Sequence, residues 1–99
     1  MVDVVVGGGK VLHVHNGDAL LGRITGSGCM ATAAIAIFLA AGGDPTTQAA
    51  LGLATYGLAA ERAAAPVDGT PPGPLAFRTR LIDEVAALRD RGVAGVRVL

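Results

Sequence analysis

The sequence predicts an α/β fold in which a strand hairpin is followed by three helices. Two β-branched runs, 3–6 and 10–15, flank three glycines and predict the hairpin. A long alanine-rich stretch follows, and Gly42-Gly43 divides it into two helical segments. The last third of the chain holds a segment with apolar residues every three or four positions, which predicts an amphipathic third helix.

The connection between the hairpin and the first helix contains a turn signal and a short extended segment. Asn16-Gly17-Asp18 is a typical turn, and residues 19–24 read as a short extended segment leading to further glycines. The first helix is expected at Met30–Ala41, because this run is rich in alanine and ends at a glycine pair.

The second helix has a clear start. Asp44 is a preferred N-cap residue, and Pro45 suits the first helical position, where no amide hydrogen is needed. This helix is expected to run to about Ala65, and it becomes charged only at Glu61 and Arg62.

The third helix is expected at 75–91, after a proline-rich loop at 66–74. Arg80 and Glu84 have the spacing of an i,i+4 ion pair on its solvent side. Residues 93–99 are predicted to form a tail or a short strand. The apolar stripe of the helix consists of Phe77, Leu81, Val85 and Leu88.

Composition narrows the class of protein. The 99 residues are enough for one domain, and residues 1–99 are interpreted as a single, partial domain. Eight acidic residues balance eight Lys and Arg, so the charge favours neither nucleic acid nor a membrane surface as partner. A single cysteine allows no internal disulfide, and the start MVDVVVGGGK does not resemble a signal peptide. We therefore expect a cytoplasmic protein.

The distribution of charge is unusual. Between Ile24 and Ala60 the only charged residue is Asp44, although two helices are expected in this window. A helix that is apolar all round is normally buried, and a domain of this size has little interior. We therefore expect that the chain oligomerises or forms part of a larger body.

The four residues Gly26-Ser27-Gly28-Cys29 stand where an extended segment turns into a helix. The first amides of a helix lack acceptors within it, and they carry the positive end of its dipole. Glycines let an anion approach these amides closely, and the same field favours a thiolate at Cys29. The turn could therefore hold a phosphate beside a general base or nucleophile. Alternatively, the glycines only form a tight turn and Cys29 is a small core residue.

Two patterns near the hairpin are weaker candidates. The string Gly7-Gly8-Gly9-Lys10 resembles a phosphate-binding loop, but that motif requires Ser or Thr after the lysine and then a helix. His13 and His15 share a strand face, but a zinc site needs three or four ligands and no third is close. We assign no metal ligand in this chain.

The string from Asn16 to Ala64 resembles the C-terminal part of hydroxyethylthiazole kinase, a family of the ribokinase-like superfamily. In this family an NGHPLL-like stretch precedes VTGTGC, an apolar helix, and a second helix with a YG-AAE pattern. The corresponding residues here are Asn16-Gly17, Leu20-Leu21, Ile24-Thr25-Gly26-Ser27-Gly28-Cys29, Tyr56-Gly57 and Ala59-Ala60-Glu61.

The resemblance implies a ribokinase-like fold and the ATP- and Mg²⁺-dependent phosphorylation of 4-methyl-5-(2-hydroxyethyl)thiazole in thiamine salvage. It implies that Cys29, in place of the aspartate of most ribokinase-like kinases, helps to deprotonate the substrate hydroxyl. It implies that Gly26 contacts the thiazole, and that the amides of Gly26, Ser27, Gly28 and Cys29 stabilise the transferring phosphoryl group. Members of the family are trimers with active sites between subunits.

The sequence departs from the family pattern in two respects. Ser27 replaces the usual threonine, which matters little where the backbone binds the ligand. Val2-Asp3 resembles the end of a TGxVD motif, so the family's ATP-contacting threonine would precede Met1, and the Mg²⁺ region would lie further upstream. The chain is thus expected to be the C-terminal third of a kinase and to be inactive alone. Another ribokinase-like small-molecule kinase, or a non-catalytic assembly or anion-binding module, remain as alternatives.

Overall fold

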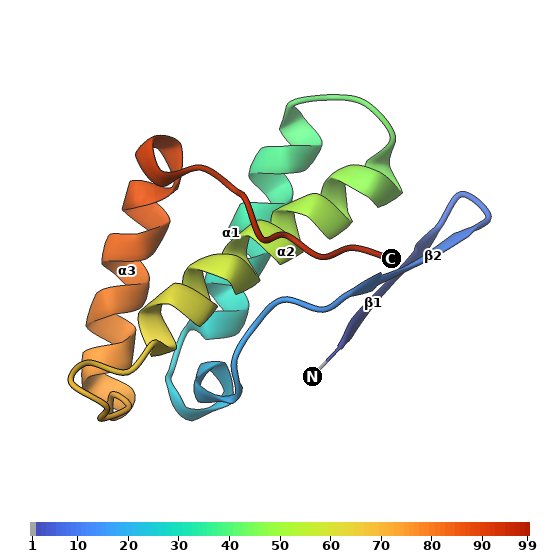
Figure 1. Ribbon diagram of the computed structural model, residues 1–99. Coiled ribbons are helices and arrows are strands. Elements are labelled where there is room, and N and C mark those ends of the chain that lie inside the picture. The colour runs from blue at the N-terminus through green and yellow to red at the C-terminus, as the bar shows by residue number, and fades with distance from the viewer. Residues whose placement is uncertain (1) are drawn as a thin grey trace.

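The computed structural model describes residues 2–99, with the backbone alone at position 89, and it has the α/β architecture that the sequence predicts. The elements in chain order are β1 (Asp3–Gly7), β2 (Lys10–Val14), the 3₁₀ helix η1 (Ala19–Arg23), α1 (Ser27–Ala40), α2 (Pro45–Ala64) and α3 (Pro74–Arg91) (Figure 1). The strand hairpin followed by three helices is confirmed.

The hairpin is antiparallel, with Gly7 opposite Lys10 across the turn. Gly8 and Gly9 have φ angles of 54° and 77°, as a two-residue hairpin turn requires. The glycines therefore close a turn rather than a phosphate-binding loop, and the Lys10 ammonium lies 3.0 Å from the Asp44 carboxylate.

The tail extends the hairpin on its β2 side. The backbone amides of His13 and Leu99 each donate to the other's carbonyl, at 2.7 and 2.8 Å. Val14 and Val98 form an antiparallel bridge one residue away. The prediction of a tail or short strand is confirmed, and Figure 1 shows this segment in red as it returns to β2.

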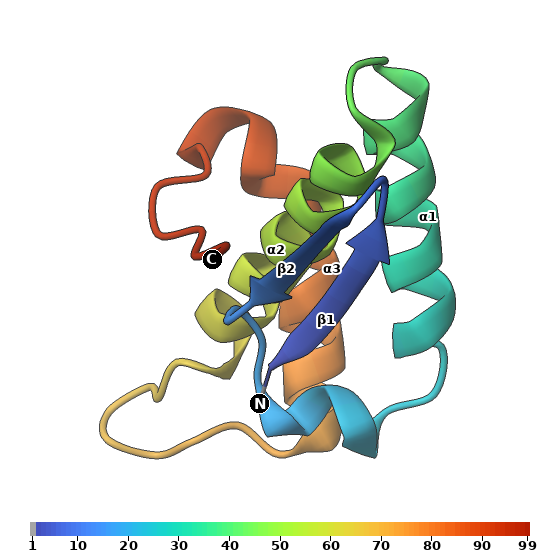
Figure 2. The same cartoon turned by 90° about the vertical axis from the view of Figure 1, so that its right-hand side faces the viewer.

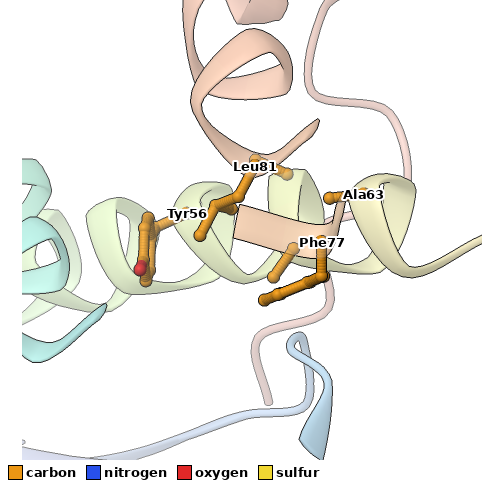
Figure 3. Packing of buried hydrophobic residues seen from close by; sticks show 6 residues of the cluster. Tyr56, Ala63, Phe77 and Leu81 are labelled. Atoms are coloured by element: carbon orange, nitrogen blue, oxygen red, sulfur yellow. The ribbon is translucent and has the colours of Figure 1, made fainter. Parts of the chain in front are cut away.

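Helix α2 is the centre of the molecule. Figures 1 and 2 show the hairpin over one side of it, α1 along another and α3 against its C-terminal half. Phe77 and Leu81 of α3 are fully buried against Tyr56 and Ala63 of α2, as Figure 3 shows. On the hairpin side, Val14 packs on Ala50 and Ala54.

Two glycines of α2 allow its neighbours to come close. A Cβ at Gly52 would lie 3.0 Å from the Ala34 carbonyl oxygen of α1. A Cβ at Gly57 would lie 2.7 Å from the carbonyl carbon and oxygen of Asn16, a distance that real contacts do not reach. The alanine and glycine content of α2 therefore sets how tightly the elements pack around it.

Two local predictions are wrong. Residues 19–23 form a 3₁₀ helix rather than an extended segment, because the Asp18 carboxylate accepts the Leu20 amide at 2.9 Å and nucleates the turn. Glu84 bonds to Arg91, two helical turns further on, rather than to Arg80. The Arg80 guanidinium instead donates to the Ala65 carbonyl at 3.3 Å, which draws it away from Glu84.

The two uncharged helices differ in burial. Helix α2 is largely buried, whereas α1 has no buried residue and leaves the Ile37 side chain 70% exposed. The outer side of the hairpin likewise exposes Val4, Val6 and Val11. The chain thus encloses one apolar helix and leaves the other open on one side. Within residues 2–99, none of the helices has both the length and the hydropathy for a membrane span.

Candidate anion site at the start of helix α1

Helix α1 begins at Ser27, three residues earlier than predicted, so Cys29 lies within its first turn. Gly26 is the N-cap residue, with φ 89° and ψ 0°, a left-handed conformation that favours glycine. The Gly26 carbonyl accepts the Met30 amide at 3.0 Å and closes the turn. The helix therefore starts early because the glycine supplies the reversal directly before Ser27.

The first turn of α1 keeps its leading amides open. Among the described residues no side chain caps this helix, and its first turn holds no acidic residue. The amides of Ser27, Gly28 and Cys29 precede the first amide that bonds within the helix. A Cβ built at Gly26 or at Gly28 would meet no atom within 4 Å from outside the local backbone, so no other part of the described chain crowds these two residues. This is the geometry of an anion site.

The Cys29 side chain is exposed. The alternative in which it fills the core is therefore wrong for this chain, whose core lies around α2 instead. A thiol in the first turn of a helix, open to solvent, is accessible to a ligand held by the adjacent amides. The four predicted residues Gly26–Cys29 are thus brought together in one turn.

Two hydrogen bonds connect Ser27 of this turn to η1 and to α2. The Ser27 hydroxyl donates to the Leu21 carbonyl of η1 at 2.7 Å. The Tyr56 hydroxyl donates to the Ser27 carbonyl at 2.9 Å. Burial raises the pKa of the Tyr56 hydroxyl above its usual value, so this donor stays protonated over the physiological pH range.

A pocket of about 230 Å³ lies beside this turn. Ser27 and Gly28 form part of its wall together with Tyr56 and Gly57 of α2, and Cys29 is not among the lining residues. Its other walls come from the hairpin strand, the following turn and η1: Asp3, Asn16, Leu21 and Gly22, with Ala31 and Leu53 from the helices. The turn thus borders an open pocket lined by β1, the turn after the hairpin, η1, α1 and α2.

Residues 1–91 match the profile of the hydroxyethylthiazole kinase family. The chain belongs to this family. A hydroxyethylthiazole kinase of Desulforudis audaxviator is 50% identical over 97 residues, which are 97% of this chain and 34% of that protein. Relatives of the same name from Rubrobacter xylanophilus and Methanoculleus marisnigri are 51% and 43% identical over 88% and 95% of this chain. The chain spans about a third of the length of these relatives.

In this hydroxyethylthiazole kinase family chain, the motif residue Asn16 joins three segments. Its side chain is 2% exposed, and its amide group donates to the Glu61 carboxylate at 2.7 Å and to the Gly95 carbonyl at 3.0 Å. Its oxygen accepts the Arg97 backbone amide. The Arg97 guanidinium completes the network by donating to Glu61. Asn16 therefore holds the tail against the hairpin and α2.

Sequence reasoning did not find these roles. From the residues alone, Asn16-Gly17 is interpreted only as part of a turn, and Tyr56 is assigned no catalytic role. The one available signal was that Asn16, Tyr56-Gly57 and Glu61 all belong to the strings that carry the family resemblance. In the structure each supports the candidate site or the segment leading to it: Gly57 touches Asn16, and Tyr56 bonds to Ser27.

Proposed function

We propose that the turn Gly26–Cys29 forms part of the active site of an ATP-dependent kinase that phosphorylates the hydroxyl of 4-methyl-5-(2-hydroxyethyl)thiazole, in thiamine salvage. The observation that carries the proposal is the uncapped first turn of α1, with open amides beside an exposed Cys29. Membership of the hydroxyethylthiazole kinase family supplies the substrate. The chain covers a third of such proteins, so the activity is proposed for the complete enzyme.

The chain's own groups have distinct roles in the proposed reaction. The substrate hydroxyl attacks the γ-phosphorus of ATP, and its proton passes to the Cys29 thiolate, which becomes a thiol. The new oxygen–phosphorus bond forms as the bond to the β,γ-bridging oxygen breaks and ADP leaves. The amides of Gly26, Ser27, Gly28 and Cys29 donate to the phosphoryl oxygens, and Gly26 also contacts the thiazole.

The described residues fit only part of the ligand set. The α1 turn suits a phosphoryl group, because its amides are open and no carboxylate stands in its first turn. For Mg²⁺ the fit is absent: nowhere in residues 2–99 do three His, Cys, Asp or Glu side chains gather as metal ligands. We therefore derive no step through the metal from this chain.

We also propose that the chain works within a larger cytoplasmic assembly, either a homo-oligomer such as a trimer or a complex with the remaining kinase segment. The exposed apolar side of α1 supports this proposal, since burying Ile37 and Leu39 against another chain would remove apolar surface from water. Sedimentation of the chain alone and with the remaining segment of a relative tests it. A monomer that binds neither a second copy nor that segment would contradict the proposal.

The activity test uses a chimera. Residues 1–99 replace the matching segment of the Desulforudis audaxviator relative, and ADP release is measured with and without the thiazole alcohol. The native chimera is expected to release ADP only when the alcohol is present. Cys29→Ala is expected to lower kcat by about a hundredfold, because a general base contributes roughly that factor.

Two further variants distinguish a base from a packing residue. Cys29→Asp supplies another base at the same place, so activity should persist or rise. Thr79→Ser, at an exposed position of α3 away from the turn, is the control and should retain native turnover. Loss of activity in Cys29→Asp together with full activity in Cys29→Ala would overturn the assignment. A chimera without thiazole-dependent turnover, made from an active relative, would favour the non-catalytic assembly or anion-binding alternative.

A further inference from the structure

We propose that Tyr56 is a positioning residue: its hydroxyl fixes the direction in which the Gly28 amide points. This inference rests on the proposed function, since it deepens the account of the same turn. The observation behind it is the 2.9 Å hydrogen bond that the Tyr56 hydroxyl donates to the Ser27 carbonyl. The two residues are 29 positions apart in sequence, so the contact joins the central helix to the turn.

The Tyr56 side chain is itself held in place. It is 4% exposed and belongs to the cluster that contains Phe77 and Leu81. Figure 3 shows the Tyr56 ring projecting from α2 in the same cluster as Leu81 of α3, with the hydroxyl oxygen at the far end of the side chain. Because the ring is packed, the hydroxyl oxygen is a fixed point supplied by the core rather than by a mobile side chain.

The bond to Ser27 acts on the next residue through the peptide group. The Ser27 carbonyl and the Gly28 amide belong to one planar trans unit, in which the C=O and N–H bonds point in opposite directions. Fixing the carbonyl toward Tyr56 therefore fixes the Gly28 amide toward the open side of the turn. A donor at this carbonyl also polarises the unit, which makes the amide a stronger donor to an anion.

The sequence of the turn makes such a fixed point necessary. Gly26 and Gly28 flank Ser27, and glycine gives the backbone more conformational freedom than any other residue. No side chain of another element stands within 4 Å of where a Cβ of either glycine would lie, so neighbouring atoms do not restrain them. The turn is restrained at Ser27, whose carbonyl lies in the first turn of α1, whose hydroxyl bonds to Leu21, and to whose carbonyl Tyr56 adds a donor from outside the helix. Donors fixed in advance are what phosphoryl transfer requires.

The test compares Tyr56→Phe with a matched loss of another buried hydroxyl. Tyr56→Phe keeps the packed ring and removes only the donor. Thr55→Val, the control, removes the adjacent buried hydroxyl, which bonds to Leu51 within α2 and does not touch the turn. Each isotope-labelled chain is titrated with inorganic phosphate, and the amide resonances of Ser27, Gly28 and Cys29 are followed. We expect phosphate affinity at the Gly28 amide to fall roughly tenfold in Tyr56→Phe and to stay native in Thr55→Val.

A rescue and a kinetic measurement complete the test. Tyr56 is the chain's only tyrosine, so growth on 3-fluorotyrosine labels this position alone and keeps its hydroxyl. This protein should bind phosphate with native affinity. In the chimera, Tyr56→Phe should lower kcat by about tenfold with an unchanged KM for the thiazole alcohol, because only transition-state donors are misdirected.

Different outcomes of these experiments would contradict the positioning role of Tyr56 and the anion site on which it depends. If the native chain shows no response to phosphate at these amides, both the anion site and the role of Tyr56 are wrong. If the native chain responds and Tyr56→Phe responds equally, only the positioning role is wrong. Equal losses in Tyr56→Phe and Thr55→Val would also overturn it, since general loosening of α2 would then explain both.

Discussion

Helices α1 and α2 follow each other in the chain, share an alanine-rich composition and pack together through Gly52, yet they differ in almost every other respect. Helix α2 is enclosed by the hairpin, α1 and α3, and eleven of its residues are buried. Helix α1 touches α2 on one side, and none of its residues is buried. Composition therefore predicts that both segments are helical, whereas their neighbours decide which becomes the core.

The two helices also differ in whether a side chain caps their first turn. The Asp44 carboxylate accepts the Thr47 amide at 3.1 Å and the Thr47 hydroxyl at 2.7 Å, so the first turn of α2 is satisfied from within. The first turn of α1 follows Gly26, which has no side chain to offer. A capped start stabilises a helix, and an uncapped start leaves amides for a ligand. One helix serves the fold and the other carries the candidate site.

The largest expected difference is between removing an apolar side chain of α3 that packs on α2 and removing one that α1 leaves exposed. Phe77 is fully buried against α2, so Phe77→Ala should lower the free energy of unfolding by about 3–5 kcal/mol. Ile37 of α1 is 70% exposed, so Ile37→Ala should change it by less than about 0.5 kcal/mol. Urea unfolding followed by far-ultraviolet circular dichroism measures both.

Ile37→Ala also has a diagnostic use. Similar losses in the two variants, at a protein concentration where the chain is monomeric, would show that Ile37 of α1 is packed as tightly as the α3 side chain that covers α2. A loss in Ile37→Ala that appears only at high concentration would instead indicate that a second copy covers α1, as the proposed assembly requires.

A smaller difference is expected from adding one methyl group to a glycine of each helix. A Cβ at Gly57 would collide with the Asn16 backbone at 2.7 Å, so Gly57→Ala should destabilise by about 1–3 kcal/mol. A Cβ at Gly28 meets open space, and Gly28→Ala should stabilise α1 by up to about 1 kcal/mol. The same substitution thus has opposite signs in the two helices, which thermal unfolding can detect. Destabilisation by Gly28→Ala would mean that the site turn is packed rather than open.

The sequence predicted those parts of the fold that depend on neighbouring residues. The hairpin turn, the stop at Gly42-Gly43 and the Asp44 cap each follow from residues a few positions apart, and all are present. Predictions failed where another segment or an unnoticed cap intervened. Asp18 turned residues 19–23 into a 3₁₀ helix, and the Ala65 carbonyl drew Arg80 away from Glu84.

The candidate site likewise has a part that the sequence predicts and a part that it does not. The turn Gly26–Cys29 could be found from sequence, because glycines before a helix and a thiol beside them form a local pattern. Its supports could not, because Tyr56 and Asn16 act on partners 29 to 81 positions away. Nothing in the residues around Tyr56 indicates that its hydroxyl reaches Ser27. Only the packing of α2 between its neighbours produces that contact.

The smallest expected effect concerns the cap of α2 and its dependence on pH. Hydrogen bonds from the Thr47 hydroxyl and from Lys10 lower the pKa of the Asp44 carboxyl to about 2, from 3.8. Between these values the unfolded chain binds more protons at this site than the folded chain, so stability rises with pH. The contribution of Asp44 is therefore complete above pH 3.8 and is lost as the pH falls through about 2.

Asp44→Asn isolates this contribution, because asparagine caps a helix about as well as aspartate but does not titrate. The difference in urea midpoint between the native chain and Asp44→Asn should shrink as the pH falls from 4 to 2, and the other carboxylates cancel in the comparison. Midpoints that stay parallel over this range would mean that the carboxylate is not bonded as described. Helix α1 has no side-chain cap to titrate, so any anion dependence at its start must come from a bound ligand.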